Sequence, residues 1–308
     1  MGNTITSGDI IVITGGGGYL GSKLAEFYLH KNCQLFLIDI NFNNLAKKLN
    51  ENYDTVHLEH LDLTSENLVR EVLNRISPDY IFHFASIIDR SRDFDIYDRL
   101  YEINVKGTIN LLKALQKISY RGFYFASTSE VYGSWKGVPF SEDSSLTSAS
   151  PYSLTKIYCE KAIQLFSDLY NKPYKIFRIF NFFGPNMPGS TFIGQMIEAF
   201  KAGKVFEMTQ GDQARDILFI DDLLTQMNVV VTKKSDFSVF NICSGKAIKM
   251  IEIVEEFEKI TGEEFQYTTL LPYRKNEVWE TRGDNSRLKS LNYIFPSFSL
   301  KEALKKCI

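Results

Sequence analysis

Tyr152 and Lys156 are the residues of this chain whose types and spacing best suit proton transfer. They are four residues apart in the run Tyr152-Ser153-Leu154-Thr155-Lys156, and on a helix that interval places both side chains on one face. A neighbouring ammonium favours the phenolate of a tyrosine, whose ordinary pKa is about 10. The pair could therefore act as a general base, with Lys156 supplying part of the necessary positive charge.

The sequence around this pair distinguishes it from Tyr19/Lys23 and Tyr132/Lys136, which have the same spacing. Tyr19 lies inside a glycine-rich loop, and Tyr132 directly precedes a glycine in a turn. Tyr152 instead follows Ser150-Pro151, which is typical of an N-cap and a first-turn proline. The spacing of apolar residues then predicts a long amphipathic helix over 151–170.

A second group of reactive side chains, Ser127-Thr128-Ser129-Glu130, follows the apolar run 122–126. Ligands of open α/β sheets bind beyond the carboxyl ends of the strands, so this position suits catalytic groups. Thr128 could hydrogen-bond a reacting oxygen, and Glu130 could reach a neighbouring carbon acid. Alternatively, the hydroxyls cap backbone groups at a strand-to-loop junction, which is the interpretation we favour for Ser127.

A glycine-rich stretch, 15–21, follows the apolar run 10–13 and precedes a helical pattern. Gly16, Gly18 and Gly21 fit the spacing G-x-G-x-x-G of dinucleotide-binding loops. Glycines let backbone N–H groups approach a pyrophosphate at the positive end of a helix. The order strand, loop, helix predicts a nucleotide site here, although such loops also close turns that bind no ligand.

Asp39 and Asp62 end the second and third expected strands. Asp39 lies eighteen residues beyond Gly21, where a carboxylate can accept both ribose hydroxyls of a dinucleotide and repel a 2′-phosphate. No Arg or Lys follows until Lys47, so the sequence favours NAD over NADP. Asp62 could accept a hydrogen bond from an adenine amino group, or it could cap a helix.

Apolar runs at 34–38, 56–61, 80–84, 122–126 and 175–180 predict further strands, and helical patterns at 22–30, 67–76, 100–117 and 151–170 fall between most of them. This alternation predicts an α/β fold with a doubly wound parallel sheet of the Rossmann type. We expect a dinucleotide-binding domain over 1–181, to which 216–245 returns, and a smaller, interleaved substrate-binding lobe over 182–308.

The composition excludes several classes of function. A formal net charge of -2 provides no broad basic field for nucleic acid, and no apolar run is long enough to span a membrane. The four cysteines lie far apart, which indicates thiols in a reducing compartment, so we expect a cytoplasmic protein. His83 is expected in the core, and the spacing of the four histidines predicts no metal site.

Taken in order, these motifs resemble the extended short-chain dehydrogenase/reductase family, in its NAD-dependent nucleotide-sugar epimerase/dehydratase branch. The resemblance extends over nearly the whole chain. The segments that carry it include Thr14-Gly15-x-x-Gly18-x-x-Gly21, Asp62-Leu63, His83-Phe84-Ala85-Ser86, Asn104-Val105-x-Gly107-Thr108, Ser127-Thr128-Ser129-Glu130-Val131-Tyr132-Gly133 and Tyr152-x-x-x-Lys156. In the C-terminal part, 178–185 and 215–222 resemble the family's segments that meet a sugar diphosphate.

The resemblance implies a set of binding residues. Those implied for NAD are Gly15, Gly18, Tyr19, Leu20, Gly21, Asp39, Asp62, Leu63, Phe84, Ala85, Asn104, Tyr152 and Lys156. Those implied for a nucleotide-diphosphate sugar are Ser129, Asn181, Arg215 and Arg274. Guanidinium groups suit the diphosphate because their planar fork meets phosphate oxygens bidentately. For Arg274 a surface ion pair is an equal alternative.

The resemblance also implies a reaction. Tyr152 removes the proton of the sugar C4 hydroxyl, Thr128 orients that hydroxyl, and a 4-keto sugar forms with reduction of NAD. The ketone is then released or reduced again, as in a C4 dehydrogenase or a 4-epimerase. Alternatively, Glu130 drives a 4,6-dehydration, or a C5 carboxylate leaves as carbon dioxide. Ser129 stands where many dehydratases have Asp, which counts against dehydration.

Functions of other classes stay open from the sequence alone. A binding protein on this fold could sense NAD without turnover, because a fold does not imply chemistry. The combination of Thr128, Tyr152 and Lys156 argues against such a sensor. An NADPH-dependent reductase of small ketones would need basic residues near Asp39. By the same resemblance, helices over 100–117 and 151–170 imply a homodimer that pairs as a four-helix bundle.

Overall fold

The computed structural model describes residues 4–89, 91–133, 137–262, 265–273, 277–293 and 297–308. Two compact units are present, and each is considered by itself. Unit 1 contains Met1–Ser134, Ser145–Arg178 and Val230–Phe240, and unit 2 contains Trp135–Ser144, Ile179–Val229 and Asn241–Ile308. Among the described residues, no helix has the length and apolar character needed to cross a membrane.

Unit 1 is built around a seven-stranded sheet in the order β10-β6-β5-β4-β1-β2-β3. The strands are β1 (Ile10–Thr14), β2 (Gln34–Asp39), β3 (Val56–His60), β4 (Tyr80–His83), β5 (Gly122–Thr128), β6 (Tyr174–Ile179) and β10 (Val239–Ile242). The pairs β1–β2, β1–β4, β2–β3 and β4–β5 are parallel. The doubly wound fold expected from the sequence is confirmed, and β10 joins the main sheet beside β6 as expected.

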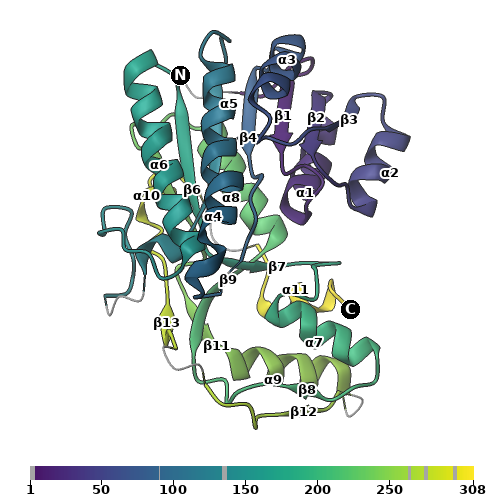
Figure 1. The fold of residues 1–308 in the computed structure, drawn as a ribbon. Coiled ribbons are helices and arrows are strands. Elements are labelled where there is room, and N and C mark those ends of the chain that lie inside the picture. The colour runs from purple at the N-terminus through teal and green to yellow at the C-terminus, as the bar shows by residue number, and fades with distance from the viewer. Residues whose placement is uncertain (1–3, 90, 134–136, 263–264, 274–276, 294–296) are drawn as a thin grey trace. The chain divides into compact units, whose positions relative to one another are not determined.

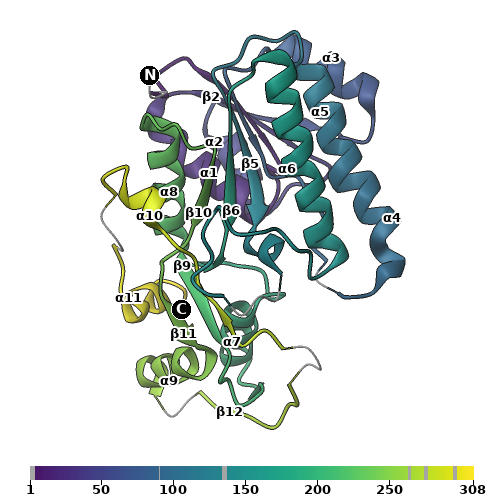
Figure 2. The same ribbon diagram turned by 90° about the vertical axis from the view of Figure 1, so that its left-hand side faces the viewer.

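Helices cover both faces of this sheet. They are α1 (Tyr19–Tyr28), α2 (Asn44–Asn52), α3 (Glu66–Ile76), α4 (Tyr97–Leu100), α5 (Gly107–Leu115) and α6 (Pro151–Tyr170), with short 3-10 turns over Leu29–Lys31, Phe94–Ile96 and Ser129–Tyr132. Figure 1 shows α5 and α6 side by side, and Figure 2 shows them on one face of the sheet with α1 and α2 on the other.

The expected helix over 100–117 differs from the structure in one respect. A π-helical segment over Tyr101–Lys106 separates α4 from α5. Asn104 lies in this segment, and its carbonyl accepts a hydrogen bond of 2.6 Å from the hydroxyl of Thr108. Wide turns of this kind often occur at functional sites, and a pattern of apolar residues three and four apart does not reveal them.

The core of unit 1 follows from the burial of the central strands. All seven residues of β5 are buried, as is expected for a parallel strand with helices on both faces. Phe82, Tyr124 and Phe177 come from adjacent strands and stack with ring centroids 4.8 and 5.9 Å apart. Phe123 and Phe125 point to the other face, where they join the apolar side chains of α3, α5 and α6.

Unit 2 contains short strands and helices. A four-stranded sheet has the order β11-β9-β13, with β7 also paired to β9, and β12 pairs with β8. The strands are β7 (Asn181–Phe183), β8 (Phe206–Glu207), β9 (Ala214–Phe219), β11 (Ala247–Lys249), β12 (Tyr267–Thr268) and β13 (Glu280–Thr281). The helices are α7 (Phe192–Lys201), α8 (Ile220–Thr232), α9 (Met250–Thr261), α10 (Ser286–Lys289) and α11 (Leu300–Lys305).

The compact units divide the chain differently from the boundaries expected at 181 and 216–245. Residues 137–144 group with unit 2, because Phe140 forms a bridge with Gly283 and the Glu142 carboxylate accepts a hydrogen bond of 2.8 Å from the Asn241 amide. Only 230–240 of the expected returning segment groups with unit 1. These are contacts between residues far apart in sequence.

His83 links β1, β4 and α5 within the core of unit 1. Its ring nitrogens lie 2.6 Å from the Thr14 hydroxyl and 2.8 Å from the Thr108 hydroxyl. Because Thr108 donates its own hydrogen to Asn104, the network assigns the ring proton to Nε2 and leaves Nδ1 to accept from Thr14. Burial, assisted by the charge of Lys156, lowers the pKa of His83 to about 3, so this ring stays neutral.

The neutral ring predicts a pH dependence of stability. The pKa of His83 is lowered by folding, so the unfolded chain binds the extra proton first, and the contribution of His83 is lost as pH falls below the ordinary value of 6.5. When the pH falls from about 7 to about 5, the free energy of unfolding of the wild type should decrease by about 2 kcal/mol more than that of His83→Gln. Denaturant titrations at both pH values measure this difference, and parallel losses would contradict it.

Candidate functional site

The candidate active site of unit 1 lies at the carboxyl edge of its sheet. The strand order 3-2-1-4-5-6 reverses between β1 and β4, and ligands of open α/β sheets bind at such a reversal. Thr128 is the last residue of β5, and Gly15 follows the last residue of β1. The sheet therefore brings the expected catalytic strand and the expected phosphate loop to the same edge.

Helix α6 begins where the sequence predicts. The hydroxyl of Ser150 accepts from the backbone N–H of Ser153, whose hydroxyl in turn accepts from the N–H of Ser150, and Pro151 occupies the first turn. This capping box satisfies donors that a helix start otherwise leaves unpaired. It also fixes the start of the helix one turn before Lys156, with Tyr152 and Lys156 both on the buried face.

Lys156 is held as a buried ammonium. Its Nζ donates a hydrogen bond of 2.9 Å to the carbonyl of Ala126 and lies 4.7 Å from the ring centre of Phe125 and 5.8 Å from that of Tyr152. Burial lowers the pKa of Lys156 to about 8, while the nearby Cys159 and Glu160 act to raise it. The lysine is thus charged at neutral pH and lies against the phenol ring, which favours the phenolate.

Thr128 and Glu130 reach the start of the same helix. The Thr128 hydroxyl accepts a hydrogen bond of 3.3 Å from the Glu130 N–H, so it caps the 3-10 turn over Ser129–Tyr132. The Glu130 carboxylate accepts a hydrogen bond of 3.2 Å from the hydroxyl of Ser150. The structure therefore brings Thr128, Ser129 and Glu130 to the helix start that carries Tyr152.

The loop between β1 and α1 has the form that a dinucleotide pyrophosphate requires. Gly15 has a φ of +72°, and a Cβ there would lie 2.6 Å from the backbone nitrogen of Ala85. At Gly21 a Cβ would lie 2.2 Å from the Gly15 carbonyl. Helix α1 starts at Tyr19, which Leu20 follows. Gly18 at its N-cap has no side chain to bond the backbone N–H groups of the first turn. Backbone donors at a positive helix end fit an anionic pyrophosphate.

Asp39 and Asp62 have different local roles. Asp39 accepts hydrogen bonds from the backbone N–H groups of Gly17 at 3.0 Å and Ile40 at 2.7 Å, which places its carboxylate beside the glycine loop. This position is compatible with the expected ribose contact. Asp62 accepts from both the N–H and the hydroxyl of Thr64, each at 2.9 Å, so the alternative of a turn cap accounts for its visible contacts.

The remaining residues expected near the cofactor surround β4 and α5. Phe84 and Ala85 follow β4, and the Ala85 N–H donates to the Thr14 hydroxyl at 3.3 Å. The Asn104 amide bonds both the N–H and the carbonyl of Ile87, at 2.8 and 3.1 Å, and so orders the loop after β4. Leu63 is buried below α5. Direct contacts of these residues with a cofactor stay predictions.

Two of the expected substrate residues, Asn181 and Arg215, are in unit 2. Asn181 starts β7, and Arg215 lies in β9, which pairs with β7. The Arg215 guanidinium forms an ion pair of 2.7 Å with Glu277 and donates to the carbonyl of Val278 at 2.6 Å. This ion pair was not expected from the sequence. Arg274 lies outside the described residues.

Sequence reasoning missed Glu160, and it considered Arg178 only as the first residue of the segment 178–185 expected to meet a sugar diphosphate. Glu160 follows Lys156 by one turn on α6, and Arg178 interrupts the apolar run of β6. They form a buried ion pair of 2.8 Å. Ser127 donates to Glu160 rather than to a backbone group, which corrects our expectation for that hydroxyl. A lone arginine inside an apolar strand is the signal that could have revealed the pair, because buried charges require partners.

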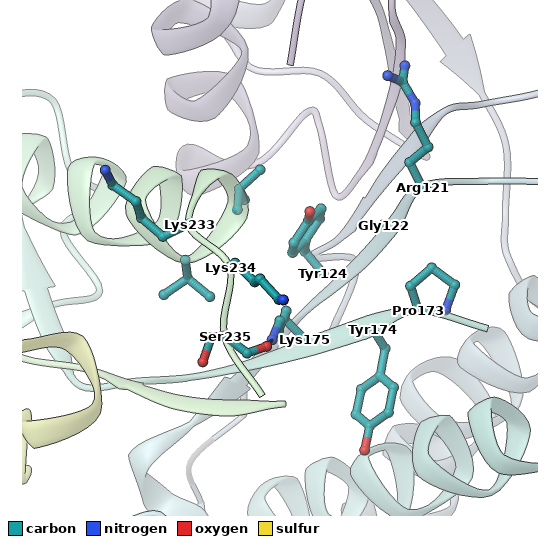
Figure 3. Close-up of a pocket in the computed structure, with 11 residues that line it drawn as sticks. Arg121, Gly122, Tyr124, Pro173, Tyr174, Lys175, Lys233, Lys234 and Ser235 are labelled. Atoms are coloured by element: carbon teal, nitrogen blue, oxygen red, sulfur yellow. Dashed lines mark hydrogen bonds between the residues drawn. The ribbon is translucent and has the colours of Figure 1, made fainter. Parts of the chain in front are cut away.

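A pocket of about 170 Å³ lies elsewhere in unit 1, at the amino ends of β5 and β6 (Figure 3). Lys175 donates to the carbonyl of Ser235 at 3.0 Å and also to that of Phe237. Arg121 forms an ion pair of 3.1 Å with Asp79, and in Figure 3 it points away from Lys175. Both cations thus make contacts within unit 1. The pocket lies at the edge of the sheet opposite the one at which Thr128 ends β5.

The grouping of metal-ligating side chains and the state of the thiols can be read from the described residues. Within the described ranges, no three His, Cys, Asp or Glu side chains are grouped so as to hold an ion. The cysteines Cys33, Cys159, Cys243 and Cys307 are buried free thiols.

A family model described as the NAD dependent epimerase/dehydratase family matches residues 11–243. The UDP-N-acetyl-alpha-D-glucosaminuronate decarboxylase of Bacillus cytotoxicus is 25% identical over 312 residues, covering 96% of this chain and 96% of the relative. The UDP-glucuronate 4-epimerase of Thermodesulfobacterium geofontis is 27% identical over 311 residues, covering 96% of this chain and 94% of the relative.

Solved structures share the fold. The UDP-glucuronic acid 4-epimerase from Bacillus cereus, in complex with UDP-glucuronic acid and NAD, superposes with a TM-score of 0.87 at 24% identity, covering 96% of both chains. The UDP-glucose 4-epimerase from Thermotoga maritima, with UDP-glucose, gives a TM-score of 0.86 at 24% identity and the same coverage.

Proposed function

The chain belongs to the NAD dependent epimerase/dehydratase family, and from this premise we propose that it oxidises the C4 hydroxyl of a UDP-linked sugar and then reduces the ketone again, as a 4-epimerase. It is an NAD-dependent enzyme of the short-chain dehydrogenase/reductase type. The observation that carries the proposal is the buried Lys156 ammonium 5.8 Å from the ring centre of Tyr152, at the sheet edge where Thr128 ends β5.

Each residue of this group has a defined task in the proposed reaction. Bound NAD would supply the hydride acceptor for the sugar carbon and the hydride donor for its return. Tyr152, as phenolate, accepts the proton of the C4 hydroxyl, and the Lys156 ammonium favours that phenolate. The Thr128 hydroxyl orients the substrate oxygen. The glycine loop and Asp39 would hold the cofactor in a fixed position, which would align the proton acceptor with the reacting carbon.

UDP is the proposed nucleotide, because the relatives described above act on UDP-sugars. Arg215 is the proposed contact for the diphosphate, together with Arg274, and Asn181 and Ser129 are proposed to contact the sugar nucleotide. Arg215 is already fixed by Glu277 and the Val278 carbonyl. A guanidinium oriented in this way loses less conformational freedom when it binds an anion.

A second candidate outcome is decarboxylation of a UDP-uronic acid. Glu130 provides the observation that favours it, because its carboxylate lies at the start of α6 through its contact with Ser150. A C4 ketone would let the bond from C5 to its carboxylate break, with the electron pair forming an enolate across C4 and C5 and carbon dioxide leaving. A proton would then add at C5 and restore the ketone. The two outcomes share the first step and differ in the fate of the ketone.

Substitution of Tyr152 by Phe tests the shared first step. The variant loses the proton acceptor and keeps the ring, so kcat should fall by about a hundredfold or more. The measurement is turnover of UDP-glucose, UDP-N-acetylglucosamine and UDP-glucuronic acid, with product masses from mass spectrometry and the C4 configuration from proton NMR. Tyr158→Phe, an exposed position on the same helix, is the matched control.

The product identifies the outcome. A sugar of unchanged mass with inverted C4 indicates the epimerase, and loss of carbon dioxide from UDP-glucuronic acid indicates the decarboxylase. Full activity of Tyr152→Phe on a sugar that the wild type converts would contradict the proposed base. Wild-type protein that binds NAD and converts none of these sugars would instead favour a cofactor-sensing protein.

A homodimer is part of the proposal, through α6 and the helical stretch that occupies the expected helix over 100–117, namely Tyr101–Lys106 and α5. Leu165 and Leu169 are 59% and 64% exposed on one face of α6, and Tyr158 lies one heptad before Leu165. Exposed apolar side chains on adjacent turns favour pairing with a second copy. The buried thiols support a reducing, cytoplasmic setting for this assembly.

The dimer proposal predicts a change in solution mass. Wild-type protein should have the mass of two chains by sedimentation, and Leu165→Glu with Leu169→Glu should yield the single-chain mass, because two charges on each helix would be buried at the interface. Leu68→Glu, at an exposed leucine on α3, should leave the mass unchanged. A monomeric wild type at working concentration would refute the proposal.

A further inference from the structure

A buried ion pair joins α6 to β6 directly behind the catalytic group. Glu160 and Arg178 are 4% and 5% exposed. The Arg178 Nη2 donates to one Glu160 oxygen at 2.8 Å, and its Nε donates to the other at 3.2 Å. This two-point contact fixes the relative orientation of the two side chains and not only their distance.

The pair also binds both ends of the segment that carries Thr128 and Glu130. At the start of that segment, the Ser127 hydroxyl donates to the Glu160 carboxylate. At its end, the Tyr132 hydroxyl accepts a hydrogen bond of 3.1 Å from the Arg178 Nη1. The segment 127–132 is therefore attached at its two ends to one ion pair, with Thr128 and Glu130 between the two attachments.

The same pair fixes α6 along β5. Lys156 donates to the carbonyl of Ala126, and Glu160, one turn later, accepts from the hydroxyl of Ser127. Two consecutive residues of β5 thus contact two consecutive turns of α6. A shift of the helix by one residue would break both contacts, so the register of Tyr152 and Lys156 against Thr128 is fixed.

Stability alone does not explain why charges occupy this place. The cost of removing two charges from water offsets much of their attraction, and apolar side chains of similar size would often stabilise the protein as well. Apolar packing, however, lacks the directed hydrogen bonds that hold 127–132 and α6 in one arrangement. The pair is better explained by the geometry that it imposes.

We propose that Glu160 and Arg178 are positioning residues, whose ion pair holds Thr128 and Glu130 in register with Tyr152 and Lys156 and keeps the charge beside Lys156 balanced. The kinetic part of this proposal rests on the proposed function, whereas the charge balance is a property of the folded chain. Removal of either partner leaves the other charge buried and unpaired, with opposite effects on Lys156.

The titratable groups on the elements packed around Lys156 are Cys159 and Glu160 on α6, Glu130 and Tyr132 after β5, His83 on β4 and Arg178 on β6. Of these, Cys159 and Glu160 act to raise the pKa of Lys156. His83 is neutral, because burial and the charge of Lys156 hold its pKa near 3. Burial opposes the charge of Arg178, but the hydrogen bonds and charge of Glu160 raise its pKa above the ordinary value. Glu160 thus acts to keep Lys156 charged, and its ion pair with Arg178 places an opposite charge next to that carboxylate.

Two single variants test this balance without any substrate. The midpoint of the Lys156 titration is followed by NMR of isotopically labelled lysines, with Lys156→Met to assign the signal. Glu160→Gln leaves the Arg178 charge uncompensated and should lower the midpoint by about one pH unit, and Arg178→Met leaves the Glu160 charge and should raise it by a similar amount. Glu160→Gln combined with Arg178→Met should return it to the wild-type position.

Turnover of the UDP-sugar tests the positioning itself. The acid limb of kcat should move in the same directions as the Lys156 midpoint. Arg178→Lys, which keeps the charge and loses the fork, should keep the wild-type pH profile while kcat falls by about tenfold or more. The KM and the NAD affinity should stay within about twofold, because these residues do not contact either ligand in the proposed site.

The outcomes separate the two proposals. Midpoints that shift in the same direction in both single variants, or stay unchanged, would overturn the positioning pair whatever the enzyme converts. Opposite midpoint shifts in the two single variants would uphold the charge balance. If the wild type at the same time converts no UDP-sugar, the proposed function is contradicted. If Arg178→Met does not fold, Glu160→Gln and Arg178→Lys carry the same test, and an unchanged kcat in Arg178→Lys would overturn the positioning role.

Discussion

The buried ammonium of Lys156 is the constraint on which the rest of unit 1 depends. A charge removed from water is costly unless fixed dipoles replace its hydration, and here the Ala126 carbonyl and the rings of Phe125 and Tyr152 do so. Two of these groups come from β5 and one comes from α6. The strand and the helix must therefore keep one relative position, and the capping box at Ser150 and the full burial of β5 serve that requirement.

The residues expected to bind the cofactor and those expected to transfer the proton meet at one edge of the sheet because its strands are parallel. Strands that all end at one edge place the glycine loop after β1, the Phe84-Ala85 segment after β4 and Thr128 at the end of β5 within one region of unit 1. His83 on β4 connects these parts, because its ring bonds Thr14 at the end of β1 and Thr108 on α5. The residues that select a particular sugar are proposed in unit 2, where Arg215 is oriented by Glu277. Family membership thus accounts for the chemistry better than for the substrate.

Much of this architecture could be predicted from the sequence because its signals are local. The bounds of α6 match the expected helix over 151–170, since Ser150-Pro151 marks its start, and the central strands match within about two residues. The π-helical segment around Asn104 and the grouping of 137–144 with unit 2 could not be predicted, because both depend on contacts between distant residues. The same holds for the ion pairs Glu160–Arg178 and Arg215–Glu277: the sequence shows the charges, and only the fold shows their partners.

The pH dependence of stability attributable to Lys156 tests the central claim most directly. Folding lowers the pKa of Lys156 from 10.5 to about 8, so the unfolded chain holds the proton more tightly, and the cost of burying the ammonium declines as pH rises between those values. Between pH of about 7 and about 9.5 the wild type should gain about 2 kcal/mol of unfolding free energy relative to Lys156→Met. A difference between the two proteins that stays constant over this range would show that the ammonium is not buried beside Tyr152, and would contradict the account.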